Sequence, residues 1–89
     1  MDANVLKEVL NDSTGKEWSV SKDTVGLYRF SLSWYVVTVE ARNPKEDNTW
    51  RLTIQNNETN ESAAIGPVKE QSVDVELYSL VNDFFNNDV

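Results

Sequence analysis

Cysteine and histidine are both absent from the 89 residues of this chain. Without cysteine there is no disulfide bridge, no thiolate ligand for zinc and no cysteine nucleophile. Without histidine the chain also lacks the commonest general base at neutral pH. These absences remove most familiar catalytic and metal-binding designs. We therefore expect a protein that is not an enzyme and that needs no metal and no cofactor.

Glycine, proline and long apolar runs are scarce as well. The three glycines are isolated from one another, so no glycine-rich loop can cradle a phosphate. No run approaches the ~20 apolar residues that a membrane span needs, and residues 1–4 lack the basic and apolar parts of a signal peptide. We expect a cytoplasmic protein with no membrane partner.

Basic residues are the third shortage, and the resulting negative charge is unevenly placed. The chain carries 8 Lys and Arg against 15 Asp and Glu, a net charge of −7. Residues 1–51 hold seven basic and eight acidic side chains, a net charge of −1, whereas residues 52–89 hold Lys69 against seven acids, a net charge of −6. The seven acids are Glu58, Glu61, Glu70, Asp74, Glu76, Asp83 and Asp88.

An acidic surface of this kind repels the phosphates of nucleic acids and attracts basic protein surfaces. The partner we expect is a protein with a basic surface, such as a nucleic-acid-binding enzyme. We expect no direct contact between this chain and nucleic acid. The competing interpretation is that the charge only keeps the protein in solution. The oligomeric state stays open between monomer and dimer.

The apolar residues, 39% of the chain, suffice for one core, and we expect a single domain over residues 1–89. Helical periodicity appears at both ends. Asp2 can cap a helix over residues 3–11, which Gly15 ends, and residues 72–86 form a longer amphipathic helix. The first helix has an apolar stripe of Val5, Leu6, Val9 and Leu10. The second has one of Val73, Leu77, Leu80, Val81, Phe84 and Phe85.

Between the helices the pattern is that of strands. Residues 17–21 and 50–55 alternate between polar and apolar, and residues 63–65 can form a short edge strand that Gly66-Pro67 ends. Residues 27–42 also alternate, but the phase changes near Ser33-Trp34, which indicates a bulge or a tight turn between two strands. A polar loop follows at residues 43–48. The expected fold is α+β: a short N-terminal helix, an antiparallel sheet of four to five strands, and a C-terminal amphipathic helix packed on the sheet.

Two sets of side chains are candidates for a function. Glu76 and Asp83 lie seven residues apart on one helix face, where a solvated surface is a simpler interpretation than an acid–base pair. Tyr35 follows the phase change, so it is the aromatic residue most able to reach a second surface as a binding anchor. The remaining aromatic residues fall on the apolar phase of their strands and are expected in the core: Trp18, Tyr28, Phe30, Trp34 and Trp50.

The chain resembles a broad class of proteins. The resemblance depends on its length, its pI near 4.3, the expected terminal helices around an antiparallel sheet and the acidic set of residues 58–88. The class consists of the small acidic inhibitors by which bacteriophages block host nucleic-acid enzymes, such as anti-CRISPR proteins and uracil-DNA glycosylase inhibitors. The resemblance covers the whole chain and involves no signature motif. It implies that carboxylates stand in for phosphates in the polynucleotide groove of a target, in the cytoplasm of a bacterial host.

Two other functions fit the same features. A bacterial toxin-immunity protein shares the size, the acidity and often a nuclease target. A homo-oligomeric regulatory or assembly protein would instead use an exposed sheet edge or helix face, and it needs no basic partner.

Overall fold

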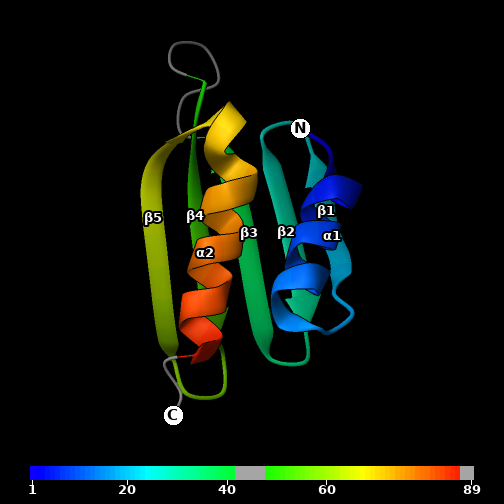
Figure 1. Cartoon of the computed structure of the whole chain (residues 1–89). Helices are drawn as coiled ribbons and strands as arrows, with labels where there is room; N and C mark the ends of the chain where they lie inside the picture. The colour runs from blue at the N-terminus through cyan, green and yellow to red at the C-terminus, as the bar shows by residue number, and fades with distance from the viewer. Residues whose placement is uncertain (42–47, 87–89) are drawn as a thin grey trace.

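The described residues form two layers, a five-stranded antiparallel sheet and a pair of helices that lie against one face of it (Figure 1). The computed structural model describes residues 1–41 and 48–86. The strands are neighbours in space in the order in which they follow in the chain. The expected α+β class is confirmed, with five strands. The elements are α1 (Ala3–Thr14), β1 (Ser19–Thr24), β2 (Leu27–Leu32), β3 (Tyr35–Ala41), β4 (Thr49–Asn56), β5 (Glu61–Lys69), the 3-10 turn η1 (Glu70–Ser72) and α2 (Val73–Asn86).

Local sequence signals set both ends of α1. The Asp2 carboxylate accepts a hydrogen bond of 2.7 Å from the N–H of Asn4, as expected for an N-cap. Gly15 adopts a left-handed conformation with φ 69°, and its N–H donates to the carbonyl of Asn11. The helix runs three residues beyond the expected range. Val5 is 46% exposed, because the helix presents Ala3, Leu6 and Leu10 to the core instead.

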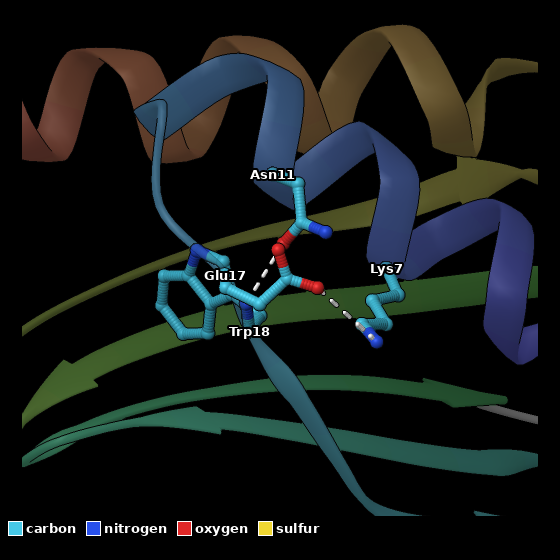
Figure 2. Close-up of polar contacts among 4 residues, drawn as sticks. All are labelled: Lys7, Asn11, Glu17 and Trp18. Carbon is cyan, nitrogen blue, oxygen red and sulfur yellow. Dashed lines mark hydrogen bonds and ion pairs between the residues drawn. The ribbon is translucent and has the colours of Figure 1, made fainter.

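Trp18 joins the end of α1 to the rest of the core. Its backbone N–H donates to Oδ1 of Asn11 at 2.8 Å, and its indole N–H donates to Oγ1 of Thr14 at 3.0 Å. The ring is fully buried and meets Phe85 of α2 edge-on, with centroids 6.3 Å apart. Figure 2 shows the Asn11 contact beside an ion pair of 3.7 Å between Lys7 and Glu17. The Glu17 side chain is 84% exposed, so this ion pair contributes little, and the burial and hydrogen bonds of Trp18 hold the loop in place.

A two-residue turn at Ser33-Trp34 explains the change of phase along residues 27–42. Leu32 and Tyr35 are direct cross-strand partners and therefore lie on the same face of the sheet. The expectation that Tyr35 reaches a second surface is wrong, because this pairing turns it toward the helices, 4.7 Å from Phe85 between ring centroids. Trp34 was expected in the core, but it occupies the turn and is 45% exposed.

The last strand is longer than its sequence indicates. It continues through Gly66 and Pro67 to Lys69, so the expectation that Gly66-Pro67 ends the strand is wrong. Trp50 pairs with Val68 and Leu52 with Ile65, which leaves the Gly-Pro pair opposite one residue of β4. Proline is tolerated at such a bulge on an edge strand, where its missing N–H need not interrupt the pairing.

The second helix lies on the sheet as its periodicity indicates, and Leu77 and Val81 are fully buried. Phe84 and Phe85 are partly buried and close an aromatic cluster with Tyr35. No helix in the described ranges is long and apolar enough to cross a bilayer. The predicted polar loop, except Asn48, and Asp88 lie outside those ranges.

Candidate protein-binding surface

Charge is separated between the two faces of the molecule. The helix layer, residues 2–14 and 70–86, carries seven carboxylates against Lys7, a net charge of −6. On the other side, the paired strand residues of the open face carry four cations against Glu40, a net charge of +3, because directly paired residues share a face. The carboxylates are Asp2, Glu8, Asp12, Glu70, Asp74, Glu76 and Asp83; the cations are Lys22, Arg29, Arg51 and Lys69.

Small polar side chains separate the cations of the open face. By the same cross-strand pairing, the open face also carries Ser31, Thr38, Thr53 and Gln55. Among the paired strand residues, no aromatic side chain lies on this face, so it offers no platform on which bases could stack. The acidic helix layer is therefore the better candidate for a specific binding surface.

A groove of about 440 Å³ runs between α2 and β5 on the helix side of the sheet. Its floor is apolar and its rim holds three carboxylates, which we call the groove carboxylates: Glu61, Glu76 and Asp83. Glu61 pairs with the buried Asn56 and so lies on the helix side of β5. Glu76 and Asp83 are two helical turns apart, about 10 Å along the axis, on the side of α2 that lines the groove.

The lining of the groove suits a cationic side chain. It consists of Glu61, Ser62, Ala63, Ile65, Glu76, Ser79, Leu80, Asp83 and Phe84, so three carboxylates and no lysine or arginine line this groove. Lysine and arginine combine an apolar stem with a charged head, and such a side chain could cover Leu80 and Phe84 while its head met the rim.

The groove brings together three of the eight residues that the sequence suggests as partner-binding. Glu70 and Asp74 lie elsewhere, in a hollow beside Asp2 at the start of α1. Glu58 is exposed in the turn between β4 and β5, where its N–H donates to Oδ1 of the buried Asn56. Tyr35 belongs to the aromatic cluster of the core, and Asp88 is outside the described ranges.

Two exposed residues of α2 were missed at the sequence level. Val75 is 70% exposed and Tyr78 is 46% exposed, and both lie off the apolar stripe of the helix. A helical projection could have identified them, because at ~100° per residue they point well away from Leu77 and Leu80. They place apolar surface on the acidic layer.

The groove carboxylates line a groove and do not converge on a point. Within residues 1–41 and 48–86, no group of three acidic side chains is close enough together to hold a metal ion. A comparison with known proteins found no matching family model, no matching curated protein and no matching solved structure.

Proposed function

We propose that this protein acts by binding and not by catalysis, and that it inhibits a nucleic-acid-handling protein by occupying its basic polynucleotide site. The separation of charge between the two faces carries the proposal. A solubility role alone requires net charge but no sidedness. Here the helix layer has a net charge of −6 while the open face has a net charge of +3.

The groove brings three carboxylates together at one site on the acidic side of the molecule. Glu76 and Asp83 are separated by about 10 Å along α2, and Glu61 faces them across an apolar floor. A basic protein surface that normally holds phosphates would be steered toward these carboxylates over a Debye length of about 8 Å at physiological salt. Cations of the partner that become desolvated against the groove would then slow dissociation.

Capture from a bacterial lysate tests the proposal with two matched variants. The groove variant carries Glu61→Gln, Glu76→Gln and Asp83→Asn. The control variant carries Glu17→Gln, Asp23→Asn and Glu40→Gln, which changes the net charge equally at sites outside the groove and the helix layer. We expect the wild-type chain and the control to retain the same basic, nucleic-acid-binding protein, and the groove variant to lose it.

The kinetics of the purified pair make the test quantitative. Association with the wild-type chain should slow with added salt, and the groove variant should bind at least tenfold more weakly, because each desolvated charge pair is worth about 1–3 kcal/mol. Equal retention by all three proteins, or an acidic partner, would leave solubility as the role of the acidic layer.

Homo-oligomeric assembly is the second candidate, and the same separation of charge favours it. An acidic layer and a basic open face are complementary, so copies could stack head to tail. Light scattering at low and high salt separates the two functions. Assembly predicts a mass that grows with concentration at low salt, whereas the inhibitor function predicts a constant mass.

A further inference from the structure

The two edges of the sheet differ in how far they are protected from pairing with another chain. In β1 the register shifts between Val20 and Lys22, and Lys22 and Asp23 place charges at that edge. Bulges and charged side chains are the usual means by which edge strands avoid further pairing. The β1 edge is therefore blunted.

The first half of β5 contains no bulge, and its one charged side chain is Glu61 at its start. Residues 61–65 pair with β4 in unbroken register, from Asn56–Glu61 to Leu52–Ile65. The bulge, Pro67 and Lys69 all lie beyond them. Within the described ranges β4 is the one strand beside β5, so this segment presents a row of unpaired N–H and C=O groups.

The groove lies along this same segment. Glu61, Ser62, Ala63 and Ile65 form its strand side, and α2 forms the other side. A second hollow of about 330 Å³ shares Ile65 and Glu76 with it and continues toward Lys69. A chain laid against β5 would thus have α2 above one of its faces over several residues.

We propose that an extended basic segment of the partner adds to residues 61–65 of β5 as a sixth strand, with its side chains reaching the groove. The proposal rests on the proposed function and names the form in which the partner binds. Addition of a strand to a free sheet edge gives affinity through main-chain hydrogen bonds and specificity through alternate side chains. Those alternate side chains would point toward α2.

The lining of the groove predicts the sequence pattern of that segment. One side chain at the centre meets the apolar Ala63, Leu80 and Phe84, while the side chains two residues before and after it approach the groove carboxylates. The outer pair would be about 13 Å apart on a strand, comparable with the ~10 Å between Glu76 and Asp83 along α2. The pattern is Lys or Arg, any residue, an apolar residue, any residue, Lys or Arg.

Charge complementarity favours this occupant over a second copy of the chain. Antiparallel pairing of two β5 strands would place two sets of groove carboxylates beside one extended sheet, and like charges facing each other destabilise a strand pair. A basic segment instead neutralises the rim. It also matches the chemistry of a protein surface that binds phosphates.

A synthetic peptide tests the proposal on the intact protein. The probe is Thr-Lys-Thr-Leu-Thr-Lys-Thr with blocked termini, titrated to about 1 mM into the isotope-labelled chain at low salt and followed by amide NMR. We expect saturable shifts in residues 61–65 and on the groove side of α2, with slower hydrogen exchange in β5. A peptide of the same composition, Lys-Lys-Leu-Thr-Thr-Thr-Thr, should bind at least about tenfold more weakly.

Two variants on adjacent residues separate the groove from the rest of β5. Ala63 faces the groove and Ala64 faces the open side, so Ala63→Lys and Ala64→Lys change the charge equally on opposite faces. Ala63→Lys should weaken peptide binding by about tenfold or more and Ala64→Lys by less than about threefold. Equal urea midpoints would show that both variants fold like the wild-type chain.

The outcomes distinguish this proposal from the proposed function. Equal binding of both peptides, or no response of residues 61–65, would overturn strand addition. If the groove variant then still loses the captured partner, the inhibitor function stands without it. If the groove variant and the wild-type chain bind alike in both experiments, both proposals fail. A dimer in sedimentation with protected β5 amides would show that a second copy occupies the edge.

Discussion

Replacing Leu77 by alanine removes a side chain that lies fully inside the interface between α2 and the sheet. The substitution deletes three carbon atoms, and at about 0.8 kcal/mol per buried CH₂ the lost transfer free energy is about 2.4 kcal/mol. The cavity left behind adds to this, since the surrounding core relaxes only in part, and the expected total is about 3–4 kcal/mol. A domain of this length has a free energy of unfolding of about 4–13 kcal/mol, so the loss is a large fraction of it.

Urea denaturation followed by tryptophan fluorescence measures this loss, since buried Trp18 contacts Phe85 of α2. With a slope of about 1–2 kcal/mol per M, the midpoint should fall by about 1.5–4 M. Val75→Ala is the matched control on the same helix, because Val75 is 70% exposed and should change stability by less than about 0.5 kcal/mol. A loss below about 1 kcal/mol for Leu77→Ala, or equal effects of the two substitutions, would refute the docking of α2 on the sheet.

Two further predictions concern single polar contacts, and the same denaturation measurement checks both. Thr14→Val removes the acceptor of the buried Trp18 indole N–H and should cost about 1–3 kcal/mol, whereas Thr14→Ser keeps the acceptor and should cost less; equal losses would contradict this role. Asn56→Ala removes the side-chain oxygen that accepts from the N–H groups of Glu58 and Thr59 and should cost about 1–2 kcal/mol. A loss below about 0.5 kcal/mol for Asn56→Ala would show that the turn does not depend on these bonds.

Patterns that depend on neighbouring residues predicted the local structure well. The cap at Asp2 and the left-handed Gly15 satisfy backbone groups that are unpaired at the ends of any helix. This requirement is local and does not depend on the rest of the fold. The buried face of α2 follows from its period, because one helix side must cover the sheet. The change of phase at Ser33-Trp34 indicated a turn, because a straight strand with one buried face cannot change the phase of its apolar residues.

The failures arose where pairing with the neighbouring strand decides the outcome. Tyr35 lies on the helix side because Leu32 is its partner across the turn, and the phase of the sequence alone does not contain that pairing. Pro67 does not end β5, because a bulge opposite β4 accommodates it. Trp34 is exposed because the turn, and not a strand, holds it.

The candidate site was predicted only as an excess of charge in residues 52–89. Counting along the chain cannot show that the open face is basic, since that depends on cross-strand partners such as Glu40 and Arg51. Nor can it separate Glu76 and Asp83, which line the groove, from Asp74, which lies toward α1. The orientation of α2 on the sheet decides which of these carboxylates line the groove and which do not.

Competition between this protein and a polynucleotide for the captured partner shows whether the acidic groove occupies the polynucleotide site. A labelled polynucleotide is bound to the purified partner, and its release is measured as this protein is added. We expect complete, mutually exclusive displacement by the wild-type chain and by the control variant. The groove variant, which lacks the charges of Glu61, Glu76 and Asp83, should require at least about tenfold more protein. A stable ternary complex, or equal displacement by the groove variant, would contradict the claim that the acidic groove occupies the polynucleotide site.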